Sequence, residues 1–152
     1  MADFPGNIGF REAEDALERF DRLCSGLPEV YCTRLHSLLA ASPDPDQALL
    51  YFDRLRQQDA AAFDRLAAAP AGLQMLAAVF ANSAFLAEAI IAHPDWAESL
   101  LTSGDLHRDF YAEAYRDLLE AELAEAGNGA PDPLTLALFR RRQILRIAAR
   151  DT

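Results

Sequence analysis

The sequence has few of the residues that strands and tight turns require. Glycine occurs only seven times in 152 residues, and no run of valine, isoleucine, threonine or tyrosine alternates with polar residues. Strands therefore have no obvious place in this chain. Alanine is very frequent instead, and leucine and phenylalanine recur among glutamate, aspartate and arginine, which is typical of helices. The composition predicts an all-α protein with no sheet.

Cysteine and long apolar runs are also scarce, and each scarcity excludes a class of protein. The two cysteines, Cys24 and Cys32, lie in adjacent predicted helices of a chain without a signal peptide. They predict reduced core thiols and exclude a disulfide framework. No stretch reaches the roughly 18 apolar residues of a membrane span, because polar residues interrupt the longest candidate, residues 73–91. We therefore expect a soluble cytoplasmic protein with no membrane partner.

Lysine is absent altogether, so all 14 basic residues are arginine. The formal net charge is −10, and the chain lacks the basic excess by which proteins displace counterions from nucleic acid. Nucleic acid is therefore excluded as a general partner. A chain rich in alanine and arginine but free of lysine suits a GC-rich coding sequence. That explanation is simpler than selection for guanidinium groups, although arginine and lysine do differ at recognition sites.

Capping residues and helix breakers divide the chain into about nine short-to-medium helices. Asp44, Pro45 and Gln47, for example, match the N-cap, first position and third position of a capping box. The predicted helices cover residues 12–24, 28–41, 45–57, 59–69, 73–81, 83–92, 94–102, 106–126 and 133–151. Their short connections indicate an orthogonal or solenoid-like bundle. We expect residues 1–9 to be disordered and residues 10–152 to form one helical domain.

One tetrapeptide, Phe-Asp-Arg-Leu, occurs three times, beginning at Phe20, Phe52 and Phe63. The spacings of 32 and 11 residues are unequal, so they do not establish a repeat of fixed period. Two explanations stay open. A helical hairpin was duplicated, or amphipathic helices drawn from a narrow set of residues repeated the word by chance.

The reactive residues form no recognisable catalytic or metal-binding constellation. His36, His93 and His107 lack the spacing of converging zinc ligands. Asp44 and Asp46 have the spacing of metal-binding carboxylates, but they follow neither a Gly-Ser turn nor a strand, so we assign them to a helix N-terminus. The acidic residues of the eighth predicted helix are interpreted as its solvated face. Neither a nucleophile elbow nor a glycine-rich phosphate loop is present in the sequence.

The last predicted helix carries the one candidate interaction site. Arginines interrupt its strongly apolar sequence, and three of them recur at i, i+4 and i+8 along one face. A helix that is apolar nearly all round is normally buried on several sides. Either the arginines extend from a half-buried helix to nearby carboxylates, or they pair with an acidic partner or a following domain. The candidate contact residues are Arg140, Arg141, Arg142, Arg146 and Arg150.

Two segments of the sequence resemble a known family. Residues 83–96, SAFLAEAIIAHPDW, resemble a helical segment with His-Pro and an aromatic residue near the start of the bacterial glutamate–ammonia-ligase adenylyltransferases. Residues 136–152, LALFRRRQILRIAARDT, are similar to an arginine-rich segment of the same family. The order and the separation of the two segments also fit, and the resemblance covers about residues 83–152.

The resemblance implies a parent enzyme that adenylylates and de-adenylylates a tyrosine of glutamine synthetase in response to nitrogen status. In that family a helical lead-in precedes a nucleotidyltransferase domain, in which a glycine-rich turn and an Asp-x-Asp pair bind Mg²⁺ and ATP. No position of the present sequence matches those residues. The resemblance therefore implies no catalytic residue and no cofactor within this segment.

We accordingly expect the N-terminal helical scaffold of such an enzyme, with the last helix packed against a downstream nucleotidyltransferase domain. The expected parent chain continues past Thr152, and its partners are glutamine synthetase and a nitrogen-signalling regulator. The alternative is a free-standing helical adaptor whose arginine-rich last helix binds an acidic partner protein.

Overall fold

The computed structural model describes residues 8–103, 112–125 and 133–151. These residues form nine α-helices and no strand, which confirms the all-α prediction. The helices are α1 Ala13–Cys24, α2 Glu29–Ala40, α3 Pro45–Gln58, α4 Ala60–Ala68, α5 Gly72–Asn82, α6 Ala84–Ala92, α7 Pro94–Ser103, α8 Ala112–Glu125 and α9 Pro133–Asp151. Most predicted limits agree within two residues, while the first part of the eighth predicted helix lies outside the described residues.

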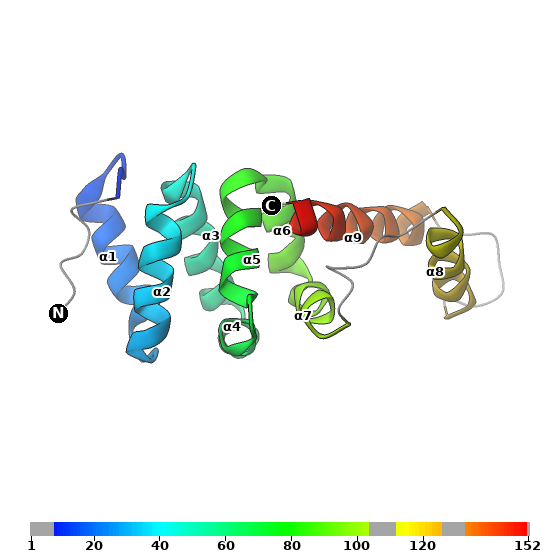
Figure 1. The fold of residues 1–152 in the computed structure, drawn as a ribbon, viewed down its shortest axis with the longest axis horizontal. Coiled ribbons are helices and arrows are strands. Elements are labelled where there is room, and N and C mark those ends of the chain that lie inside the picture. Colours follow the sequence, from blue (N-terminus) through cyan, green and yellow to red (C-terminus); the bar gives the residue numbers. More distant parts are fainter. Residues whose placement is uncertain (1–7, 104–111, 126–132, 152) are drawn as a thin grey trace.

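The helices are arranged in an elongated row. Helices α1, α2, α3, α5 and α6 stand side by side, and α4 and α7 lie across one edge of the row (Figure 1). Helix α9 lies parallel to the long axis of the molecule, with its last turns beside α5 and α6 and its first turns extending toward α8, which stands at the end remote from α1 (Figure 1). This is the solenoid-like arrangement that the short connections predicted.

Side-chain caps and single extended residues set the helix limits. The Asp44 carboxylate accepts a hydrogen bond from the backbone N–H of Gln47 at 3.0 Å, as the capping pattern predicted. The Gln47 side-chain amide does not complete the predicted capping box; it donates to the Phe80 carbonyl at 2.6 Å and ties α3 to α5. Asp59, with φ −147° and ψ 84°, ends α3 and caps α4. Ser83 ends α5 and caps α6 in the same way.

Three phenylalanines from three helices form the centre of the core. Phe52 on α3, Phe63 on α4 and Phe80 on α5 are all fully buried. The ring of Phe52 meets that of Phe80 at 5.0 Å between centroids and that of Phe63 at 6.5 Å, both nearly edge to face. Edge-to-face contacts are favourable for aromatic rings. At the N-terminal end of the described chain, Ile8 also packs against this core.

The three copies of Phe-Asp-Arg-Leu have the same role in α1, α3 and α4. Each phenylalanine and each leucine is buried. Each arginine pairs with a carboxylate farther along the row, at Asp53, Glu88 and Glu98. These pairs join residues 31, 34 and 33 positions apart. The common role explains the repeated word physically, whichever of its two origins is right.

The first of these pairs has a buried carboxylate. Asp53 is only 4% exposed and accepts two hydrogen bonds from the guanidinium of Arg22, at 2.7 and 3.3 Å. The hydrogen bond to Asp53 raises the pKa of Arg22. Since a buried carboxylate without a partner is costly, this pair fixes how α1 lies on α3.

The two cysteines lie near each other, Cys24 at the end of α1 and Cys32 in the first turn of α2. Both are half-buried free thiols, and the Cys32 thiol lies 3.8 Å from the carbonyl oxygen of Cys24. Burial, followed by the hydrogen bond to Cys32, raises the pKa of Cys24. A raised pKa keeps this thiol protonated and poorly reactive at neutral pH.

None of the described helices is both long enough and apolar enough to cross a membrane.

Candidate interaction site on the last helix

Helix α9 packs against the helices of the row through one of its sides. Leu145 is fully buried, and Leu138, Ala148 and Ala149 pack against the same core. These residues face α5 and α6, the helices that α9 contacts in the row. Helix α8 covers a further side, on which Arg146 is buried, so α9 is buried on more than one side but not all round.

A second side of α9 is apolar and exposed. Leu136, Ile144 and Ile147 are 36, 37 and 43% exposed, and Arg140 is exposed among them. Spacings of three, four and eight residues place these four side chains on one face. We call this face the outer stripe. Its large apolar side chains lie in line, which distinguishes it from scattered exposed residues of an ordinary surface.

The arginines of α9 divide between several environments. Arg141 is half-buried, with its guanidinium 4.7 Å from the ring centroid of Phe85 on α6, a cation–π contact. Arg140 belongs to the outer stripe and makes no hydrogen bond or ion pair within the described chain. Arg150 is exposed near the end of the helix.

Arg142 and Arg146 lie together on the side of α9 that faces α8. Arg142 is half-buried, 3.4 Å from the Ser99 hydroxyl and 3.9 Å from a carboxylate oxygen of Glu122. Arg146 is only 4% exposed; it donates to the Tyr115 hydroxyl, and its guanidinium lies 5.3 Å from the Tyr115 ring centroid. The structure thus gives both arginines partners inside the chain. Whether the five candidates also contact another domain or protein stays a prediction.

The seam between α7, α8 and α9 contains a small cavity of about 80 Å³. The side-chain oxygen of Gln143 is buried there and has no hydrogen-bond partner in the part of the chain that the structure describes. Besides Gln143, the lining consists of Ser99, Leu100, Leu118, Glu122, Phe139, Arg142 and Arg146.

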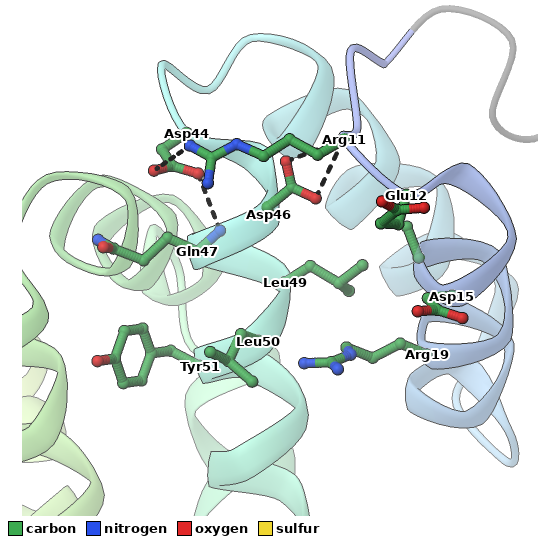
Figure 2. Close-up of a pocket in the computed structure, with 11 residues that line it drawn as sticks. Arg11, Glu12, Asp15, Arg19, Asp44, Asp46, Gln47, Leu49, Leu50 and Tyr51 are labelled. Carbon is green, nitrogen blue, oxygen red and sulfur yellow. Dashed lines mark hydrogen bonds and ion pairs between the residues drawn. The ribbon is translucent and has the colours of Figure 1, made fainter.

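A larger hollow, of about 410 Å³, lies between α1 and the start of α3 (Figure 2). Both acidic and basic side chains line it. Asp46 accepts from the backbone N–H of Arg11 at 3.3 Å, and the Arg11 guanidinium lies 3.9 Å from Asp44 (Figure 2). Because both aspartates hold the local structure, this hollow supports the interpretation of Asp44 and Asp46 as helix N-terminus residues.

The histidines do not assemble into a site in the described structure. His93 ends α6, as expected from its place before Pro94, and stacks on Trp96 at 4.3 Å between ring centroids. His107 lies outside the described residues. Among residues 8–103, 112–125 and 133–151, no three or more histidine, cysteine, aspartate or glutamate side chains gather as they do around a metal ion.

The sequence of the chain matches the model of a known protein family. The model described as glutamate-ammonia ligase adenylyltransferase matches residues 73–152, more than half of the chain. The chain belongs to this family. The match spans α5 to α9, so the arginine-bearing helix and its neighbours lie within the adenylyltransferase-related segment. Neither a curated protein nor a solved structure shows significant similarity to the chain.

The family resemblance and the arginine positions came from the sequence, but the partners of those arginines did not. Nothing in the sequence marks Phe85 or Tyr115 as a partner of the last helix. Both pair with α9 across long sequence separations. Residue spacing within a single helix carries no signal for such contacts.

Proposed function

We propose that this member of the glutamate–ammonia-ligase adenylyltransferase family is the N-terminal, non-catalytic helical scaffold of its enzyme. That enzyme adenylylates and de-adenylylates glutamine synthetase and thereby regulates nitrogen assimilation in the bacterial cytoplasm. The observation that carries the proposal is the family match over residues 73–152. The matched residues contain neither an Asp-x-Asp pair nor a glycine-rich phosphate loop, so residues elsewhere in the enzyme supply the chemistry.

In this proposal the outer stripe of α9 packs against the nucleotidyltransferase domain that binds Mg²⁺ and ATP. An aligned apolar face with one arginine among its residues has the composition of the centre of an interface. Arg140 then meets an acidic or carbonyl group of that domain. Glutamine synthetase and a nitrogen-signalling regulator are partners of the whole enzyme.

The absence of catalysis is tested by calorimetric titration of the chain with Mg-ATP. We expect no heat of binding, and no adenylyl transfer to glutamine synthetase by the chain alone. Binding of Mg-ATP at micromolar concentration contradicts the scaffold role.

The docking role of α9 is tested by adding the nucleotidyltransferase domain of the same enzyme in trans. A dye that fluoresces on apolar surfaces should bind the chain through the outer stripe and be displaced by the domain. The double variant Ile144→Ser, Ile147→Ser should bind both the dye and the nucleotidyltransferase domain less well. Leu50→Ser is the matched control, because Leu50 is 37% exposed on α3, away from α9. Equal effects of the two changes contradict docking at the outer stripe.

A further inference from the structure

Helix α8 is attached to the molecule differently from the helices of the row. None of its 14 residues is buried. Each of the helices α1 to α7 buries at least two residues. Leu118, in the middle of α8, is 37% exposed. Since hydrophobic stabilisation scales with buried apolar area, and only half-buried leucines such as Leu119 and Leu123 supply it here, that effect holds α8 less firmly than it holds the helices of the row.

The side-chain contacts that hold α8 involve arginines of α9. Tyr115 accepts the hydrogen bond of Arg146 and lies against its guanidinium, and Glu122 lies near Arg142. The charges of the whole helices match these contacts. Five carboxylates and one arginine give α8 a formal charge of −4, while five arginines and one aspartate give α9 a charge of +4. The attachment therefore includes an electrostatic part that salt should weaken.

The fit between the two helices is incomplete. The cavity of about 80 Å³ lies in their seam, and Gln143, one of the residues that line it, has a buried side-chain oxygen without a donor from the described chain. Well-packed interiors have few voids, and their buried polar atoms are hydrogen-bonded. The seam between α8 and α9 thus leaves one buried polar atom of α9, the Gln143 oxygen, without a partner in the described chain.

We propose that the side of α9 formed by Phe139, Arg142, Gln143 and Arg146 is a docking groove for an acidic amphipathic helix. Helix α8 is the internal occupant of this groove, and an acidic helix of a partner protein takes its place. Carboxylates on the partner face Arg142 and Arg146, and a side-chain donor reaches the Gln143 oxygen. The inference rests only on the contacts of α8 with α7 and α9, and it holds whether or not the outer stripe docks a catalytic domain.

An internal occupant weakens the apparent affinity of any external one. A tethered helix acts at an effective concentration in the millimolar range, so a partner must compete with it. Changes that loosen α8 without altering the groove should therefore tighten binding of an external acidic helix. Tyr115→Ala combined with Leu118→Ala makes such a change, because both side chains belong to α8.

The probe is a fluorescein-labelled peptide with the sequence of residues 112–125, titrated with the full chain by fluorescence anisotropy. We expect the loosened double variant to bind it at least about tenfold more tightly than the unaltered chain. Adding Arg142→Gln to that variant should weaken binding about fivefold or more. Arg140→Gln is the matched control and should leave the affinity unchanged, since Arg140 lies on the outer stripe. Circular dichroism verifies that each variant is folded.

Equal affinities of the unaltered chain and the loosened variant overturn the proposal, as do equal losses from Arg140→Gln and Arg142→Gln. A peptide with its five carboxylates replaced by amides should not bind, and binding as tight as that of the acidic peptide also overturns it. Hydrogen exchange of the unaltered chain tests the displacement of α8 without any substitution. Saturating acidic peptide should speed exchange of the α8 amides and leave α3 and α5 unchanged, whereas unchanged exchange in α8 contradicts displacement.

Discussion

The helices of the row and the pair α8–α9 are held in two different ways. Helices α3 to α6 bury most of their apolar side chains, caps fix their ends, and the pair of Arg22 with the buried Asp53 ties α1 to α3. Helix α8 buries no residue, and α9 leaves the outer stripe exposed. The first arrangement makes a stable support. The second leaves surfaces on which another helix or domain can dock.

The largest expected difference between the two regions concerns the same residue type. Phe52→Ala removes a fully buried ring that contacts two others, so it should lower the free energy of unfolding by about 3–5 kcal/mol. Phe85→Ala removes a ring that is 54% exposed and rests on Arg141, and should cost no more than about 1 kcal/mol. Urea unfolding of the two variants measures both values. Similar losses would show that the α6–α9 contact is as tightly packed as the core.

The second largest expected effect on stability concerns Gly72, which lies close to the backbone of Leu66 within the row. A Cβ atom on Gly72 would lie 1.9 Å from the backbone oxygen of Leu66, so Gly72→Ala must displace backbone between α4 and α5. We expect a loss of about 2 kcal/mol or more. Gly9→Ala is the control, because no atom lies within 4 Å of its Cβ position, and its effect should stay within about 0.5 kcal/mol. Thermal unfolding compares them, and a mild effect at Gly72 would contradict the tight packing of these helices.

The outer stripe should tolerate polar substitution in the chain alone. Ile147→Ser removes a side chain that is 43% exposed, and we expect the free energy of unfolding to change by about 0.5 kcal/mol or less. Leu145→Ser, two residues earlier but fully buried, should be strongly destabilising. A large loss from Ile147→Ser in urea unfolding would mean that the stripe is covered within the chain itself.

The smallest expected effect is a pH dependence within the row. The hydrogen bond from Arg54 lowers the pKa of Glu88 below 4.5. This pair therefore stabilises the fold fully above about pH 4.5, and its contribution is lost as the pH falls through the lowered pKa. Both side chains are substantially exposed, at 40 and 52%, so the effect is small. Unfolding free energies of the chain and of Arg54→Gln should converge as the pH falls, and a constant difference would contradict this assignment.

Local signals in the sequence predicted the helices well. Asp44 acts as a cap where expected, because a cap depends on only three or four neighbouring residues. The burial of α9 could not be predicted in the same way. Its apolar pattern indicated contacts on several sides, but the placement of neighbouring helices decides which sides are covered. The pairing of Arg146 with Tyr115 likewise depends on how α8 is placed.

Several side-chain hydrogen bonds between helices join residues that are 31 to 34 positions apart. This spacing has a consequence for how the protein folds during its synthesis. Helices α1, α3 and α4 meet their long-range partners within about one such interval, so this part of the chain need not wait for distant segments. As the ribosome releases the polypeptide, α1 can be secured once α3 has emerged, and α3 once α6 has emerged. The support is thus largely assembled before the surfaces of α9 leave the exit tunnel.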